Sequence, residues 1–310
     1  MIKFERHITV SSTETNIMEI LVKACEDFSL SNAVLKSAIN KGALWLSRGK
    51  YTQRIRKIKK PLHPQDIIHF YYDEKVLSQQ PPKAILIADE THYSIWYKPY
   101  GMLSQGSKWS DHCTIARWAE TTLLPQRPAF IVHRLDRAAS GLIIIAHSKK
   151  AAQAFSQIFE HHQLEKIYHI IVHGLLPNDI NEKNGLAITT KIDDKQAKSI
   201  FFPLEKNTEK QLSLVKVNIE TGRKHQIRKH AASINLPVVG DRLHGDKKIE
   251  LANDMNAEKV NSEEVNLQLC AVKLSFTCPF SQEEKYFELP PQLTLSLTEI
   301  VKKLTTTDCK

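Results

Sequence analysis

Apolar residues recur at helical spacing in three stretches of the chain. Residues 16–26 and 31–39 place apolar side chains three and four positions apart, and residues 149–160 do the same over three turns. Ser31 and Ser148 stand where they can cap the second and third of these stretches, and Gly42 can end the second. The pattern predicts two short helices near the N-terminus and a longer one in the middle of the chain.

Runs that alternate between apolar and polar residues, or are wholly apolar, predict strands in much of the remaining chain. A further helix is expected to begin at Lys224, after the turn at 221–223. Residues 246–266 are charged and poor in apolar side chains, which is typical of a loop. The expected strands are 43–46, 67–71, 94–97, 141–146, 166–174, 195–201 at a sheet edge, 212–219 and 267–276.

The segment 76–83 (VLSQQPPK) is polar and contains two adjacent prolines, a composition typical of a linker. The chain is 310 residues long, which is more than one average domain. We therefore predict an N-terminal domain over 1–75, a linker over 76–90 and a second domain over 91–310.

Charge adds a candidate partner to this outline. The net charge is +9 and the isoelectric point is near 9.2. Residues 1–80 hold 13 Lys and Arg against 8 Asp and Glu. A basic balance of this kind favours a polyanionic partner such as nucleic acid, although many cytoplasmic enzymes are mildly basic too.

A basic run without any acid lies between the two predicted strands of the N-terminal domain. A solvated surface is the simpler explanation of such a run, but cations without a counter-charge repel one another and suit phosphate contacts. We expect this run to bind RNA or DNA. Its members are Arg48, Lys50, Arg54, Arg56, Lys57, Lys59 and Lys60.

Cysteine and histidine give little support to a disulfide framework or a metal site. The five cysteines are odd in number and form no closely spaced pair. The histidines at 161, 162, 169 and 173 lack carboxylate or cysteine ligands at a fitting spacing. The first residues lack the apolar core of a signal peptide and no apolar run approaches the length of a membrane span, so a cytoplasmic protein is expected.

Asp136 is the candidate catalytic residue of this chain. It stands in the stretch 133–137 (HRLDR), among two arginines and a histidine, just before an apolar strand. Adjacent cations favour the charged form of a carboxylate. From these residues alone the stretch is either a salt-bridge corner or a site with an ionised nucleophile. Cations at 223–229 lie at the start of the expected helix, where positive charge is unfavourable because it opposes the helix dipole. Unfavourable local features of this kind tend to occur at functional sites.

Several motifs taken together resemble the RluA family of pseudouridine synthases. The order helix, helix, strand, basic segment, strand in residues 1–75 is similar to the S4-like RNA-binding domain that often accompanies this family. The motifs, in family order, are 98–101 (KPYG), 133–137 (HRLDR) with 140–142 (SGL), 166–174 (KIYHIIVHG), and 222–228 (GRKHQIR) with 240–241 (GD).

The resemblance implies an α+β fold, with a catalytic domain on a mixed, mostly antiparallel sheet flanked by helices and loops, beside a small S4-like α/β domain. It implies that Asp136 is the nucleophile that detaches uracil, that Arg228 pairs with it, and that Tyr168 stacks on the extruded base. We expect Asp136 to be nearly buried. The residues expected to bind RNA are Arg134, His133, Lys98, Arg223 and Lys166, together with Arg54, Arg56, Lys57, Lys59 and Lys60 of the basic run. For Lys98 and Arg223 the expected role is to position either the RNA or the loops of the active site.

The expected activity is therefore the isomerisation of uridine in structured RNA by a flipped-out base, without metal or organic cofactor. Ribosomal RNA is the expected substrate because a basic module suits a large folded RNA, and transfer RNA is the alternative. A monomer and no membrane partner are expected. A non-catalytic RNA-binding or ribosome-assembly protein, and a metal-dependent hydrolase that uses the histidines, are the alternatives from other classes.

Overall fold

The computed structural model describes residues 1–11, 16–245 and 265–307. It divides into two compact units, which are described separately. Unit 1 consists of Met1–Pro82 and Leu103–Gln126, and unit 2 of Lys83–Met102 and Arg127–Lys310. The predicted bounds 1–75, 76–90 and 91–310 differ in assigning 103–126 to the second domain, and they stay a prediction. Parts of the expected linker form regular structure, since α3 (Glu74–Leu77) and β5 (Ile85–Asp89) overlap it.

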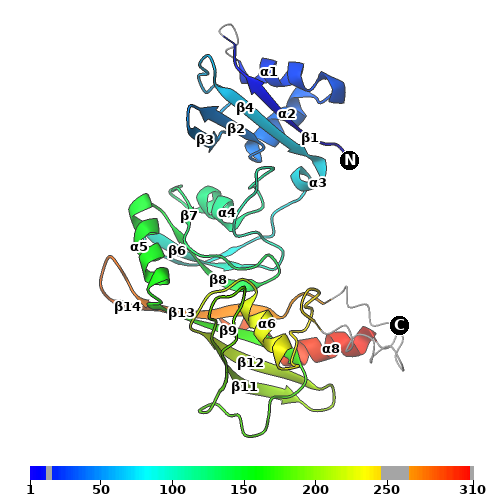
Figure 1. Ribbon diagram of the computed structural model, residues 1–310, viewed down its shortest axis with the longest axis vertical. Coiled ribbons are helices and arrows are strands. Elements are labelled where there is room, and N and C mark those ends of the chain that lie inside the picture. The colour runs from blue at the N-terminus through cyan, green and yellow to red at the C-terminus, as the bar shows by residue number, and fades with distance from the viewer. Residues whose placement is uncertain (12–15, 246–264, 308–310) are drawn as a thin grey trace. The chain divides into compact units, whose positions relative to one another are not determined.

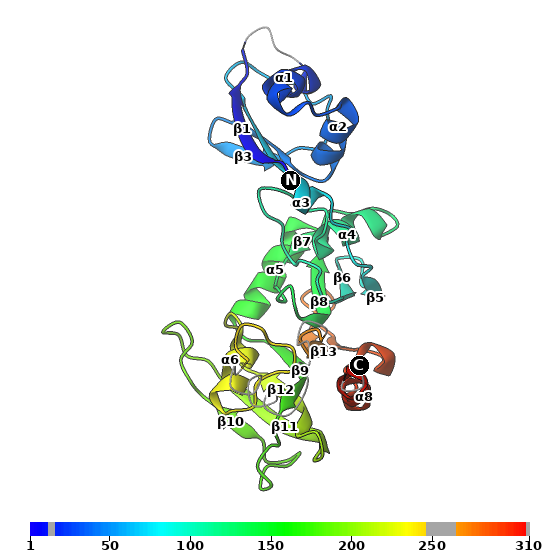
Figure 2. The same cartoon turned by 90° about the vertical axis from the view of Figure 1, so that its right-hand side faces the viewer.

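Unit 1 is built on a small antiparallel sheet with two helices on one face (Figures 1 and 2). The strand order is β1-β4-β2-β3, and β1 was not expected from the sequence. The elements are β1 (Lys3–Thr9), α1 (Ile17–Ala24), the short 3-10 helix η1 (Glu26–Phe28), α2 (Asn32–Asn40), β2 (Leu44–Arg48), β3 (Tyr51–Arg54), β4 (Ile67–Asp73), α3 and α4 (Ile115–Thr122).

The two N-terminal helices confirm the sequence prediction, and their caps explain where they start. Asn16 accepts a hydrogen bond from the amide of Met18, and Ser31 accepts one from the amide of Val34. The buried faces, with Leu21 of α1 and Leu35 of α2, form one core with the inner face of the sheet. Burial of this apolar stripe, rather than helix propensity, holds such short helices in place.

Unit 2 contains a mixed sheet that, within the described residues, has ten strands in all. Only β8 and β13 pair in parallel, so the expected mixed, mostly antiparallel sheet is confirmed. The main path is β10-β11-β12-β9-β13-β8-β6-β5, with β14 beside β13 and β7 beside β8. The strands are β5, β6 (Tyr93–Lys98), β7 (Phe130–Ile131), β8 (Ser140–Ala146), β9 (Leu164–His173), β10 (Leu186–Ile188), β11 (Ser199–Asn207), β12 (Leu212–Ile219), β13 (Leu269–Thr277) and β14 (Glu284–Glu288).

Helices cover parts of this sheet. Helix α5 (Lys149–Glu160) packs on β8 and β7 and begins at Ser148, as predicted. Helix α8 (Leu297–Thr307) packs against Leu212 and Leu214, while α6 (Gln226–Ser233) lies on the other side of these strands (Figure 2). The 3-10 helix η2 (Pro291–Leu293) precedes α8. None of the described helices is long and apolar enough to cross a bilayer.

Two details of the strand prediction need correction or remain open. The segment 195–201 was expected to form an edge strand, but β11 begins at Ser199 and lies between β10 and β12, so that expectation was wrong. A three-residue partner strand carries too little pattern to be found from sequence. Of the loop expected over 246–266, residues 246–264 lie outside the described residues.

The register of the central strands places three residues of the sequence motifs, together with Ala271, in one row across the sheet. Tyr168 of β9 is opposite Ala271 of β13, Ala271 is opposite Gly141 of β8, and Gly141 is opposite Lys98 of β6. The loop that carries Asp136 ends at the start of β8. Three motifs that are far apart in the chain therefore meet at the same level of the sheet.

Gly141 permits the closest strand contact in this row. Its φ is +115°, and a Cβ atom there would lie 2.3 Å from both the nitrogen and the oxygen of Ala271. A side chain at this position would push β8 away from β13.

We predict that Gly141→Ala lowers the free energy of unfolding by about 2–4 kcal/mol, because it adds both overpacking and backbone strain. Gly101→Ala is the matched control, since Gly101 also has positive φ (+82°) but a Cβ there would meet nothing within 4 Å. The control should cost only about 1–2 kcal/mol. Urea unfolding of both variants measures the difference, and equal losses would contradict the close-contact explanation.

Candidate active site

Asp136 lies in the loop between β7 and β8. The amide of Ala139 donates to the carbonyl oxygen of Asp136 at 3.1 Å, which closes a turn, and Leu135 beside it is buried. The Asp136 side chain is 31% exposed. The expectation that Asp136 is nearly buried was therefore wrong, because a loop anchored by its buried neighbours leaves the carboxylate partly open.

Arg228 comes from the first turns of α6 and is almost fully buried, with 5% of its side chain exposed. Its Nη1 is 3.6 Å from Oδ2 of Asp136. Its Nε donates to Asp241 at 2.7 Å, and its Nη2 donates to the other oxygen of Asp241. The guanidinium thus binds Asp241 in a bidentate pair and uses its remaining nitrogen for Asp136.

Asp241 is the main partner of Arg228, a role that the sequence did not reveal. The amides of Leu243 and His244 also donate to its carboxylate, at 2.9 and 3.0 Å. Burial opposes ionisation of Asp241, but the hydrogen bonds from Arg228 and from these two amides outweigh it and leave its pKa below the ordinary value. Asp241 therefore carries the negative charge that a buried guanidinium requires.

Tyr168 of β9 is 8% exposed and lies close enough to Asp136 for their charges to interact. Burial raises the pKa of its phenol, and the negative charge of Asp136 raises it further. The hydroxyl group therefore keeps its proton at physiological pH. The structure brings together the three residues that were expected to be catalytic: Asp136, Arg228 and Tyr168.

Lys98 is wholly buried, which gives no support to an RNA contact from it and leaves the positioning of loops as its expected role. Its ammonium group donates to the carbonyl oxygens of Met102 at 2.9 Å, Ala139 at 2.6 Å and Pro99 at 3.3 Å. Three acceptors match the three donors of the charged form. Lys98 ties the loop after β6 to the end of the Asp136 loop.

His133 and Lys166 are partly exposed, and both contact Phe159 within unit 2. The ring of His133 stacks on Phe159, and its Nε2 accepts a hydrogen bond from the amide of Ile144. Burial and the nearby charge of Lys166 lower the pKa of His133 to about 3. The Lys166 ammonium lies 5.4 Å from the centre of the Phe159 ring. The neutral His133 ring supports β8, and the structure gives no support to an RNA contact from it.

Arg134 and Arg223 occupy more open positions. Arg134 is exposed, two residues before Asp136. Arg223 is partly exposed, and its Nε donates to the carbonyl of Gln196 at 3.1 Å. The buried side chain of Gln226 accepts from the Arg223 amide at 3.0 Å, which fixes the turn before α6.

A histidine pair that was not expected from the sequence lies near Asp136. Nε2 of His225 is 3.7 Å from Oδ2 of Asp136, and Nδ1 of His225 is 2.9 Å from Nε2 of His244. Sequence reasoning could not have found this pair, because the two residues are 19 positions apart and meet only through the fold.

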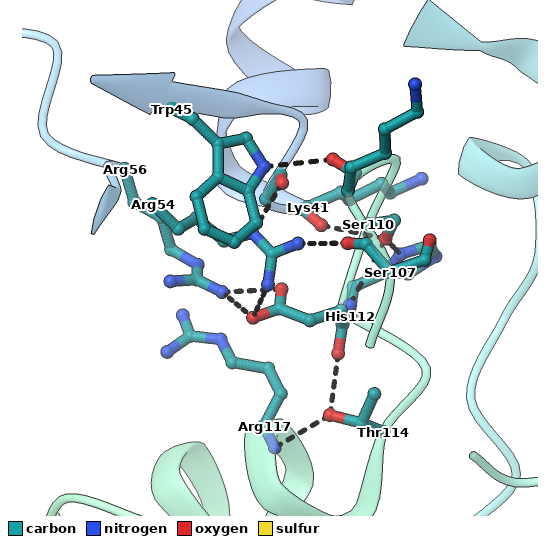
Figure 3. Close-up of polar contacts among 12 residues, drawn as sticks. Lys41, Trp45, Arg54, Arg56, Ser107, Ser110, His112, Thr114 and Arg117 are labelled. Carbon is teal, nitrogen blue, oxygen red and sulfur yellow. Dashed lines mark hydrogen bonds and ion pairs between the residues drawn. The ribbon is translucent and has the colours of Figure 1, made fainter. Parts of the chain in front are cut away.

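The basic run of unit 1 is partly neutralised. Arg54 and Arg56 both form ion pairs with Asp111, and the guanidinium of Arg54 lies over the ring of Trp45 (Figure 3). Arg48 pairs with Asp66 at 2.7 Å. The expectation of seven cations without a counter-charge was therefore wrong. Both partner acids, Asp66 and Asp111, lie outside the run, and Asp111 is 55 residues from Arg56. Lys57 and Lys59 are exposed and, among the described residues, form no ion pair.

No group of three or more His, Cys, Asp or Glu side chains within the described residues could hold a metal ion. His169 and His173 belong to β9, and burial lowers the pKa of both rings. The metal-dependent hydrolase alternative thus finds no ligand set in this part of the chain.

Comparison with known proteins identifies relatives of this arrangement. Residues 92–233 match a family model described as RNA pseudouridylate synthase. The chain is 32% identical over 225 residues to a protein of Vibrio parahaemolyticus named tRNA pseudouridine synthase C, covering 66% of this chain and 89% of the relative. It is 27% identical over 299 residues to a protein of Aquifex aeolicus named uncharacterized RNA pseudouridine synthase, covering 90% of this chain and 91% of the relative.

Two solved human structures share the fold. The protein titled RNA pseudouridylate synthase domain containing 1 matches with a TM-score of 0.53 and 19% identity, covering 73% of this chain and 98% of that chain. Domain containing 4 matches with a TM-score of 0.52 and 18% identity, covering 71% and 92%. At this identity the likeness concerns the fold alone.

The burial of Lys98 predicts a pH dependence of stability. Burial lowers the pKa of Lys98 from 10.5 to about 7, although Asp136 acts in the opposite direction. Between these two values the unfolded chain binds more protons than the folded one. The free energy of unfolding should therefore rise with pH from about 7 to 10, by about 1.4 kcal/mol per pH unit from this group.

Lys98→Met should lose this contribution. We predict that the stability difference between the wild type and Lys98→Met changes in favour of the wild type as the pH is raised from 7.5 to 9.5. Urea unfolding at three pH values measures it, and Lys149→Met, at the exposed start of α5, is the control. Parallel curves for the wild type and Lys98→Met would show that Lys98 keeps an ordinary pKa.

Proposed function

The chain belongs to the RNA pseudouridylate synthase family, and we propose that it isomerises uridines of transfer RNA through nucleophilic attack by Asp136. As a member of this family it is an enzyme that converts uridine in RNA into pseudouridine, and the RluA-type resemblance seen in its motifs is confirmed. The roles of single residues and the choice of RNA are the proposal.

The position of Asp136 carries the proposal. A carboxylate that acts as a nucleophile must be ionised, held in place and open to its substrate. The guanidinium of Arg228, 3.6 Å away, favours the charged form, and 31% of the Asp136 side chain is exposed. Two nitrogens of the Arg228 guanidinium are bound to Asp241, so only Nη1 approaches Asp136. The guanidinium can therefore attract the Asp136 carboxylate without burying it.

The other residues fit the remaining needs of the reaction. The bond between C1′ and N1 breaks and a bond between C1′ and C5 forms, while C5 loses a proton and N1 gains one, so the atoms balance without any co-reactant. Tyr168 offers an aromatic face for the extruded base and a protonated hydroxyl group beside Asp136. Extruding the base costs a few kcal/mol, and Arg134 is exposed where its planar group can fill the vacated space.

Transfer RNA is our first choice of substrate. A relative whose length this chain covers to 89% carries the name tRNA pseudouridine synthase C. The expectation of ribosomal RNA depended on an unpaired basic run, and three of its seven cations are paired within unit 1. Ribosomal RNA stays the second candidate, since the exposed Lys57 and Lys59 can still contact phosphates of a large RNA.

Asp136→Asn should abolish pseudouridine formation, by at least about a thousand-fold, because the amide keeps the shape of the carboxylate but cannot attack. Pseudouridine maps of transfer and ribosomal RNA from cells with wild-type or variant protein measure this. Asp193→Asn, an exposed acid paired with Lys229, is the control and should keep all sites. Sites that vanish from ribosomal RNA alone would favour the second substrate, and unchanged maps would refute the catalytic role of Asp136.

The basic run predicts a salt effect. Replacing both Lys57 and Lys59 by Ala should weaken RNA binding and reduce the slope of log affinity against log salt by about one to two, since each phosphate contact contributes about 0.7–0.9. Binding measured at several salt concentrations gives the slope. Lys183 and Lys206, also exposed, supply the matched double variant, which should behave like the wild type. An unchanged slope in the first variant would exclude these lysines from the interface.

A further inference from the structure

His225 occupies an unusual backbone position for its residue type. Its φ and ψ are +56° and +26°, in the left-handed region, at the residue that precedes the first turn of α6. Ser, Thr, Asp, Asn and Gly are preferred there, and the His225 side chain makes no capping hydrogen bond to the helix. Helix capping therefore does not explain the histidine. Residues with sparsely populated backbone conformations cluster at active sites and ligand-binding loops.

The ring of His225 is directed at the proposed nucleophile. Its Nε2 is 3.7 Å from Oδ2 of Asp136, the same oxygen that Nη1 of Arg228 approaches at 3.6 Å. Nε and Nη2 of Arg228 are bound to Asp241. His225 thus brings a second side-chain nitrogen close to Asp136, from the start of the same helix.

His244 determines which nitrogen of His225 carries the proton. One proton lies between Nδ1 of His225 and Nε2 of His244, which are 2.9 Å apart. If the neutral His225 ring donated this proton from Nδ1, its Nε2 would carry no proton. The lone pair of Nε2 would then face the negatively charged carboxylate of Asp136, which is a repulsive contact. If His244 donates instead, His225 carries its proton on Nε2 and points it at Asp136. The second arrangement satisfies both contacts.

We propose that His225 is a positioning residue for Asp136, and that His244 fixes its tautomer. Together with Arg228, the donor on His225 holds the carboxylate in the orientation for attack and limits its rotation. This inference rests on the proposed role of Asp136 as the nucleophile. It assigns a task to two residues that the motif comparison left without one.

The proposal also implies a pH effect. Burial lowers the pKa of His225, the charges of Arg228, His244 and Lys224 lower it further, and Asp136 opposes them. His244 likewise has a pKa lowered by burial, and it faces Asp241, Arg228, Lys229 and Asp136. When the pair takes up a proton in acid, the resulting imidazolium binds Asp136 more strongly and weakens its attack. The acid side of the kcat profile should therefore include this protonation.

Two substitutions of His225 separate positioning from backbone strain. Asn tolerates the left-handed conformation but is too short to reach Asp136, whereas Gln reaches further with an amide donor but is strained in this conformation. We expect His225→Asn to lower kcat about 10- to 100-fold with KM for RNA nearly unchanged, and His225→Gln to recover most of the loss. If the residue served the backbone alone, the order would be reversed, with Asn the better replacement.

The pH profile and the tautomer provide a second readout. His225→Gln does not titrate, so its acid limb of kcat should move to lower pH than that of the wild type. His244→Phe should lower kcat less than His225→Asn does. It removes the partner that fixes the tautomer of His225 but leaves the His225 ring beside Asp136. An acid limb unchanged in His225→Gln would contradict the proposal.

Failure of this inference is distinguishable from failure of the proposed function. Asp136→Asn serves as the reference in the same assay on the full chain. If Asp136→Asn is inactive while both His225 variants match the wild type, only the positioning role is refuted. If Asp136→Asn remains active, the nucleophile assignment itself is refuted.

Discussion

The buried guanidinium of Arg228 is the constraint on which the proposed site depends. A positive charge with 5% of its side chain exposed is stable only if an acid lies against it, and Asp241 meets this need with both carboxylate oxygens. Asp241 is in turn held by two backbone amides of the turn that follows it. Because this pair satisfies the buried charge, Asp136 can interact with Arg228 at a longer distance and stay open to RNA. A tighter bond between Asp136 and Arg228 would bury the proposed nucleophile.

The sheet register determines which residues surround that charge. Tyr168, Ala271, Gly141 and Lys98 are opposite one another on four adjacent strands. Gly141 allows β8 to approach β13. The ammonium group of Lys98 donates to the carbonyl oxygen of Met102, in the loop after β6, and to that of Ala139, at the end of the Asp136 loop. The wall of the site and the loop that carries the proposed nucleophile are therefore parts of one packed layer. Displacing any of these strands would move Tyr168 relative to Asp136.

Local patterns predicted the elements well, and long-range pairing explains what they missed. Helix α5 and strand β12 appear with the expected bounds, because a serine cap and a clean alternation are encoded in neighbouring residues. The motifs also led to Asp136, Tyr168 and Arg228. They could not show that Arg228 binds Asp241 first or that His225 meets His244, since these contacts exist only after α6 and the turn at 240–244 have folded together. Burial of Lys98 was equally invisible, because its three acceptors are backbone carbonyls.

The basic run of unit 1 illustrates the same limit for charge. The absence of acids from the run predicts unpaired cations, yet Asp66 and Asp111 neutralise Arg48, Arg54 and Arg56. Each paired arginine must break its ion pair before it can bind a phosphate, so the free energy gained from counterion release falls with every such pair. At most four of the seven cations, all lysines, then remain for RNA without that cost. Lysines act as point charges and carry no planar fork for bases. Unit 1 would therefore add affinity more than sequence preference, and discrimination among uridines would fall to the residues around Asp136.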